Sequence, residues 1–149
     1  IPDCIRSLEA HQAIEIRSPK SVRPWEHVLE PLSGYMILAQ KMWNHPTEYC
    51  EGWNFGPEEE SVSTVWEVAT ALVNSYGYGE LKDVSTSDAL HEAKLLMLNI
   101  NKAKTRLGWH PRMDMTTCIS LVADWYKRYK TEDVYNLCVE EINKYIANK

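Results

Sequence analysis

The amino-acid sequence predicts one small α/β domain in which several helices surround a few short strands. Apolar residues recur at intervals of three and four over most of the chain, which is the spacing of amphipathic helices, and short alternating runs between them indicate strands. The chain has 149 residues, of which 44% are hydrophobic and 25% charged, the balance of a globular domain with one core. The expected strands are too few for a complete doubly wound sheet.

Three elements are expected in the first third of the chain. Pro2 suits the first turn of a short helix, and residues 14–17 alternate apolar and charged side chains like a strand. A second helix is expected to begin at Glu30-Pro31, because proline is favoured at the first helical position. One stripe of this helix is expected to be buried, and it consists of Leu32, Tyr35, Met36, Ala39, Met42 and Trp43.

The middle of the chain is expected to contain three more strands and one helix. The strands are expected at residues 52–55, 81–84 and 94–98. The helix has Ser61 or Ser63 as its cap and ends at Gly77, since hydroxyl side chains favour helix starts and glycine favours helix ends.

The last third of the chain is expected to be helical. A short helix is expected to be capped by Asn101 and ended by Gly108. Two longer amphipathic helices follow it. The first begins at Asp114, and the two are joined near residues 131–132. Their predicted buried stripes are Met115, Cys118, Ile119, Val122, Trp125, Tyr126 and Tyr129, and then Tyr135, Cys138, Val139, Ile142, Tyr145 and Ile146.

Charge and hydropathy exclude several classes of partner. A net charge of −5 and a pI near 5.5 oppose nucleic-acid binding, which requires clustered Lys and Arg. No apolar run approaches the roughly 20 residues that cross a bilayer, and no leader peptide precedes the first helix, so a cytoplasmic protein without membrane contact is expected. The four cysteines are widely separated and form no CxxC pair, which favours reduced thiols buried among apolar neighbours.

Arg23 is the candidate binding residue that the local sequence indicates first. It stands at an expected loop-to-strand junction in residues 23–28, RPWEHV, where the guanidinium can present two donors to a pyrophosphate. The alternative for Arg23 is an ordinary surface ion pair.

A family resemblance favours the first of these interpretations. Residues 23–35, RPWEHVLEPLSGY, match the signature segment of the CDP-glucose 4,6-dehydratases, which are extended short-chain dehydrogenase/reductases. The resemblance covers nearly the whole chain in the family's order, through residues 1–6 (IPDCIR), 53–57 (WNFGP), 91–93 (HEA), 102–103 (KA), 107–111 (LGWHP) and 124–126 (DWY). The chain departs from the wider family at Glu30 and Asn99, where Asp is usual, and both departures affect helix starts more than chemistry.

The resemblance implies roles for particular residues. Arg23 occupies the position that contacts the diphosphate of the bound nucleotide sugar. His91 or Glu92 lies where relatives hold the ribose or the phosphates, with a solvated loop pair as the alternative. Trp25 either stacks on the ligand or packs at an interface with the rest of the protein, and packing is favoured. The expected fold is therefore the small mixed helix-and-strand substrate-binding domain of residues 1–149, with the Rossmann half absent.

The residues that catalyse the family's reaction have no proper counterpart in the sequence. The glycine-rich turn that holds NAD, the Tyr-x-x-x-Lys pair and the assisting acids are expected on an N-terminal Rossmann half of the same protein. Two chance Tyr-x-x-x-Lys matches, Tyr126 to Lys130 and Tyr145 to Lys149, lie on late amphipathic helices. His45, Glu48 and Cys50 imitate a metal site but have no further ligand at suitable spacing, so no metal is expected.

Three functions remain open at this point. The first is that the chain, which opens at Ile1 without Met, belongs to a longer parent protein that is an NAD-dependent lyase of deoxysugar and O-antigen biosynthesis and a homo-oligomer. The second is a non-catalytic module that binds nucleotide sugars or another protein. The third is another nucleotide-sugar dehydratase or epimerase. Under the first, the chain alone is inactive and exposes an apolar face at Trp25 and Phe55-Gly56.

Overall fold

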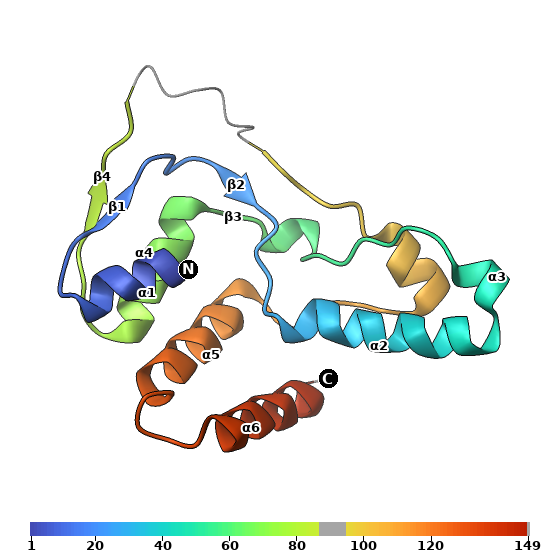
Figure 1. Cartoon of the computed structure of the whole chain (residues 1–149). Coiled ribbons are helices and arrows are strands. Elements are labelled where there is room, and N and C mark those ends of the chain that lie inside the picture. The colour runs from blue at the N-terminus through green and yellow to red at the C-terminus, as the bar shows by residue number, and fades with distance from the viewer. Residues whose placement is uncertain (87–94, 149) are drawn as a thin grey trace.

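The computed structural model describes residues 1–86 and 95–148 and confirms the mixed α/β class (Figure 1). Its α-helices are α1 (Pro2–Glu9), α2 (Leu29–Asn44), α3 (Pro46–Tyr49), α4 (Val65–Tyr76), α5 (Met115–Arg128) and α6 (Val134–Ala147). Its strands are β1 (Ile14–Ile16), β2 (Val22–Arg23), β3 (Ser63–Thr64) and β4 (Leu81–Asp83). A 3-10 turn, η1 (Glu59–Ser61), and a π-helical turn, η2 (Ala103–Leu107), complete the described elements.

The strands form two separate two-stranded sheets. β1 pairs with β4 in parallel, with Ile14 opposite Leu81, and β2 pairs with β3 in antiparallel fashion, with Arg23 opposite Ser63. Leu95 forms an isolated parallel bridge with Val22, so the chain returns beside β2 after residues 87–94. Both sheets are short, and the surrounding helices therefore determine most of the packing.

The first hydrophobic core lies between α1, α4, α5 and the β1–β4 sheet. Its buried members are Ile5, Leu8, Ile14, Ile16, Val68, Ala69, Leu72, Ile119 and Ala123. α4 enters this core through a capping box, because the Thr64 side chain accepts the Glu67 amide N–H while the Glu67 carboxylate accepts the Thr64 N–H. The predicted cap at Ser61 or Ser63 is therefore wrong, whereas the predicted end at Gly77 is confirmed by its left-handed φ of 101°.

A second core lies where α2, α3, η2 and the segment before η1 meet. Trp109 is 2% exposed and meets the edge of Phe55 at a centroid distance of 5.0 Å. Gly34 lets α2 approach the Phe55 ring, since a Cβ at this position would overlap the ring. Phe55 is 6% exposed and Gly56 is also buried, so the expected exposed apolar face at these residues is wrong.

The predicted buried stripe of α2 is largely on the wrong face. Leu32, Met36 and Trp43 are 46%, 73% and 88% exposed, whereas Gly34 is buried and Ile37 and Leu38 pack against the second core. α2 carries apolar residues on both faces, and close packing at Gly34 selects the inner one. We call Leu32, Met36 and Trp43 the outer stripe of α2.

Residues 52–55 also differ from expectation, since they form no strand in the described structure. An extended segment becomes a strand only when a neighbour completes its hydrogen bonds, and no described strand lies beside this one. Likewise, residues 95–98 contribute only the Leu95 bridge, and Lys94 lies outside the described residues.

The C-terminal helices α5 and α6 begin as predicted and fold into a hairpin (Figure 1). Asp114 caps α5 and Asp133 caps α6, each accepting a backbone N–H three residues along. The predicted buried stripe of α6 is wrong for most of its members, because only Tyr145 of that stripe is buried, together with Leu137.

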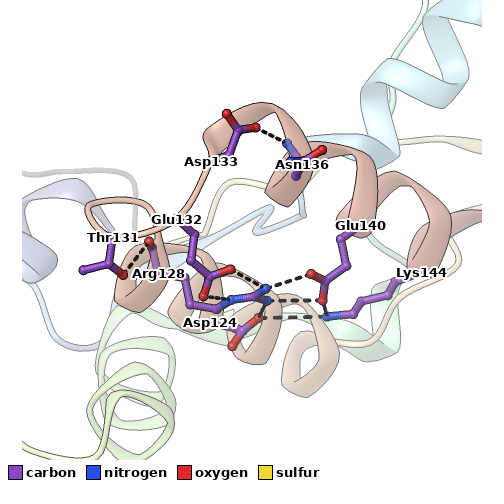
Figure 2. Close-up of polar contacts among 8 residues, drawn as sticks. All are labelled: Asp124, Arg128, Thr131, Glu132, Asp133, Asn136, Glu140 and Lys144. Atoms are coloured by element: carbon purple, nitrogen blue, oxygen red, sulfur yellow. Dashed lines mark hydrogen bonds and ion pairs between the residues drawn. The ribbon is translucent and has the colours of Figure 1, made fainter.

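Arg128 joins the two helices through a network of ion pairs (Figure 2). Its guanidinium lies within 2.9 Å of carboxylate oxygens of Asp124, Glu132 and Glu140, and Lys144 lies 2.7 Å from Glu140. These hydrogen bonds, chiefly from Arg128, lower the pKa of Glu140 to about 2. The charged face of α6 is thereby turned toward α5.

Glu30 connects α2 to the C-terminal half of the chain. Its side chain is 1% exposed, and one carboxylate oxygen accepts the backbone N–H groups of Arg112 and Met113 at 2.8 Å each. The other oxygen accepts the Tyr145 hydroxyl at 2.8 Å. Glu30 therefore ties α2, the segment before α5 and α6 together.

Candidate functional site

A cleft of about 590 Å³ opens between α1, β1 and the start of α4. Its walls are mostly apolar, and polar side chains stand among them. The apolar walls include Ile14, Ile16, Val65, Val68 and Ala69, and the polar side chains include Glu15, Arg17 and Ser18. This volume and this mixture of surfaces are typical of sites for small organic molecules.

Trp25 forms one wall of the cleft and also packs against the first hydrophobic core. Its indole Nε1 is buried and has no hydrogen-bond partner in the structure. Buried donors normally find a partner, so the unpaired indole N–H of Trp25 is an exception among the buried polar atoms of the described chain. Trp25 therefore lies between the first core and the cleft, and its two predicted roles, stacking on a ligand and packing at an interface with the rest of the protein, stay predictions.

Arg23 lies two residues before Trp25, at the end of β2, and is half-buried. One guanidinium nitrogen donates to the carbonyl of Val22 at 2.8 Å, and the Trp25 N–H donates to the Arg23 carbonyl at 2.9 Å. The predicted loop-to-strand position of Arg23 is wrong in its order, because Arg23 ends the two-residue strand β2 and a loop follows it. Its proposed contact with a diphosphate stays a prediction.

The other two predicted site residues, His91 and Glu92, lie outside the described residues. The described chain resumes at Leu95, which pairs with Val22, and the Leu96 N–H donates to the Val22 carbonyl at 3.2 Å. Leu95 and Leu96 are thus paired with β2, the strand that carries Arg23.

Glu26 is a titratable residue that the sequence did not single out. One of its carboxylate oxygens is buried without a partner, and burial together with the charge of Glu30 raises the pKa of Glu26 to about 7. Glu26 lines a second cavity of about 420 Å³ with Val28, Trp125 and Glu141, whose pKa is also raised by burial. No local sequence signal predicts this, because α5 and α6 bury Glu26 from the far end of the chain.

The raised pKa of Glu26 makes the chain less stable as the pH increases. The native state holds a proton on Glu26 between pH 4.5 and about 7, while the unfolded state has released it, so unfolding becomes easier across this interval. Allowing for partial solvent screening, we expect the unfolding free energy of the wild type to fall by about 1 to 2 kcal/mol between about pH 4.5 and 8 because of Glu26. Glu26→Gln should lack this part of the fall, because glutamine does not titrate. Urea denaturation at several pH values measures this. A Glu26→Gln profile parallel to that of the wild type would contradict the assignment.

The remaining candidate sites do not gain support from the structure. Within residues 1–86 and 95–148, no three His, Cys, Asp or Glu side chains gather in a way that holds a metal ion. Tyr145 is buried and donates to Glu30, and its sequence partner Lys149 lies outside the described residues.

Cys118 is buried and Cys4 is half-buried, but Cys50 and Cys138 are exposed, so the expectation of buried thiols holds only in part. None of the described helices combines the length and apolarity that a membrane span requires.

The chain is similar to known proteins in its sequence and in its fold. The chain is 39% identical over 148 residues to a CDP-glucose 4,6-dehydratase of Salmonella typhimurium, a match that covers 99% of this chain. The predicted resemblance to the CDP-glucose 4,6-dehydratases is confirmed. The chain spans 41% of the length of that relative. No protein-family model matches the chain.

A solved structure shows a similar fold. The crystal structure of a dTDP-glucose 4,6-dehydratase from Bacillus anthracis, in complex with NAD, superposes with a TM-score of 0.69 at 19% identity. The superposition covers 88% of this chain and 39% of that one. The fold of this chain is therefore also found as one part of a larger nucleotide-sugar dehydratase.

Proposed function

We propose that the chain is the nucleotide-sugar-binding part of a CDP-glucose 4,6-dehydratase. The observation that carries this proposal is the 39% identity to such an enzyme across 99% of the chain. The cleft beside Trp25 supports it, because its volume suits a nucleoside and its apolar walls suit a flat base.

Arg23 is the proposed anchor for the diphosphate. A guanidinium donates two parallel hydrogen bonds to phosphate oxygens, and a half-buried position strengthens these bonds relative to bulk water. His91 or Glu92 is proposed to hold the ribose or the phosphates, and Trp25 to border the base. Together these residues would fix the nucleotide and leave the glucose free to reach catalytic groups elsewhere.

The proposed reaction converts CDP-glucose to CDP-4-keto-6-deoxyglucose and water, in deoxysugar biosynthesis in the cytoplasm. The sugar is oxidised at C4, loses water across C5 and C6, and regains the hydride at C6. NAD would take up that hydride and return it, so the cofactor is not consumed. We propose that NAD and the catalytic Tyr-x-x-x-Lys lie in a Rossmann part of the parent protein, and that the 149-residue chain contributes binding and orientation only.

The outer stripe of α2 is the proposed contact with that remaining part. Leu32, Met36 and Trp43 are between 46% and 88% exposed, and they lie on the face of α2 opposite the second core. Exposed apolar stripes of this kind mark surfaces that are covered in the complete protein. Since the chain spans 41% of its relative, the rest of the same polypeptide is the proposed cover.

Turnover by the parent protein tests the proposed function. Incubation with NAD and CDP-glucose should yield a product with a C4 ketone and a C6 methyl group, both of which NMR detects directly. dTDP-glucose and UDP-glucose serve as matched competitors that differ in the base. Preferred turnover of either competitor would assign the protein to another nucleotide-sugar dehydratase, and binding without turnover would leave a non-catalytic module.

A further inference from the structure

The second cavity, of about 420 Å³, is lined by the connection between β2 and α2 and by residues of α1, α5 and α6. We call it the Glu26 cavity. Its apolar walls include Val28, Trp125 and Tyr126, and the two aromatic rings meet edge to face with their centroids 5.2 Å apart. Pockets for small molecules range from about 300 to 1,000 Å³, so this volume suits a single ring with its substituents.

His27 brings a hydrogen-bond donor without a partner to this cavity. The residue is 4% exposed, and its Nδ1 accepts the backbone N–H of Leu29 at 3.3 Å, which places the ring proton on Nε2. Burial lowers the pKa of His27 and keeps the ring neutral. Nε2 has no hydrogen bond to any described residue, yet the sealed polar atoms without a partner are Trp25 Nε1 and Glu26 Oε2. The His27 N–H is therefore open to the cavity that the residue lines.

Two carboxyl groups, those of Glu26 and Glu141, complete the polar lining, and no lysine or arginine stands beside them among the described lining residues. Because the pKa of Glu26 is raised to about 7, its protonated and ionised forms are both present near neutral pH. A ligand hydroxyl pairs with either form, since it donates to a carboxylate and accepts from a carboxylic acid. An organic cation would pair with the ionised form alone and would meet the His27 N–H. The cavity therefore favours a neutral, hydroxylated ligand.

We propose that the Glu26 cavity binds a pyranose ring. The His27 N–H donates to one ring hydroxyl, the carboxyl groups of Glu26 and Glu141 pair with others, and the aromatic wall at Trp125 covers the apolar C–H face of the sugar. This division into an apolar wall and a few convergent polar groups is that of a small-molecule site.

Such a ring has two possible sources. Trp25 lines the cleft proposed for the nucleotide and Glu26 lines this cavity, while Ile1 lines both. The ring is therefore either the glucosyl group of a nucleotide sugar held in that cleft or a separate saccharide. The first source rests on the proposed function, whereas the second is independent of it.

Two variants of the parent protein test the site by isothermal titration calorimetry. Glu141→Ala removes a half-buried carboxyl group, and His27→Phe replaces the donor with an apolar ring. Each should weaken pyranose binding about tenfold, because each removes one hydrogen bond to the sugar. Asn143→Ala is the matched control, since Asn143 is exposed on α6 and lies outside the cavity. Circular dichroism checks that the variants fold, and Glu141→Ala keeps the test decisive if His27→Phe does not.

Three ligands distinguish the two sources. Weaker binding of CDP-glucose with unchanged binding of CDP would support the site and identify the glucosyl group. Unchanged binding of CDP-glucose with loss of methyl glucoside binding, measured in saturating CDP, would support the site and identify a separate saccharide. Equal weakening for CDP and CDP-glucose, or no weakening for any ligand, would overturn the proposal. If the wild type fails to bind CDP-glucose, the proposed function is wrong, and methyl glucoside alone still tests the cavity.

Discussion

Replacement of Glu30 by alanine should reduce the unfolding free energy of the chain by about 3 to 5 kcal/mol. Glu30 is 1% exposed, and its carboxylate accepts the N–H groups of Arg112 and Met113 and the hydroxyl of Tyr145. Alanine would leave all three donors without this acceptor and would open a cavity at the junction of α2, α5 and α6. Urea denaturation followed by tryptophan fluorescence measures the loss.

Two further variants separate the contributions of these contacts. Tyr145→Phe removes one donor and should cost about 1 kcal/mol, because the other two remain satisfied. Glu60→Ala changes the same residue type at an exposed position and should stay within about 0.5 kcal/mol of the wild type. A Glu30→Ala variant as stable as Glu60→Ala would show that this carboxylate does not join the three segments.

Replacement of Arg23 by alanine should weaken the binding of CDP-glucose to the parent protein by about 1.5 to 3 kcal/mol, which is roughly 10- to 150-fold. The reason is the loss of charge-assisted hydrogen bonds to the diphosphate. Arg23→Lys keeps the charge but loses the paired geometry, so its affinity should fall between those of the wild type and alanine variants. Isothermal titration calorimetry measures the dissociation constants.

Cytidine provides a control ligand for this prediction because it lacks the diphosphate. Its affinity should be nearly the same for the wild type and for Arg23→Ala. Arg6→Ala is the matched protein control, since Arg6 is exposed on α1 and pairs with Asp3 of the same helix. If Arg23→Ala binds CDP-glucose as tightly as Arg6→Ala does, Arg23 is not the anchor.

Local signals in the sequence predicted several elements correctly. α1, the ends at Gly77 and Gly108 and the cap at Asp114 all depend on residues that are neighbours in the chain. A cap or a left-handed glycine needs little help from the rest of the fold. β1 and β4 were also predicted, although each becomes a strand only by pairing with the other. These features could therefore be predicted without a structure.

Features that depend on distant segments were predicted poorly. The inner face of α2 is decided by contact between Gly34 and Phe55, and residues 52–55 lack a described partner strand. The cap of α4 was expected at Ser61 or Ser63, but the reciprocal contact between Thr64 and Glu67 places it at Thr64. Periodicity reports which faces are apolar but not which apolar face a tertiary contact will bury.

The candidate site, too, could be predicted only where it depends on residues that are neighbours in the chain. Arg23 and Trp25 could be proposed from the sequence because they belong to a continuous matching segment. The cleft beside Trp25 could not, since its walls come from α1, β1 and α4. The raised pKa of Glu26 also escaped prediction, because the residues around it include Trp125 and Glu141, which α5 and α6 bring from the far end of the chain.

The central claim is that the cleft beside Trp25 binds the nucleotide of a nucleotide sugar. The most direct test is to follow the indole N–H resonance of Trp25 by NMR in the parent protein, assigned by its loss in Trp25→Phe, while CDP-glucose is added. We expect this resonance to shift and saturate with the dissociation constant found by calorimetry, because Trp25 lines the cleft and a ligand bound there changes the surroundings of its indole ring. Saturating CDP-glucose that leaves the Trp25 resonance unchanged would contradict the account.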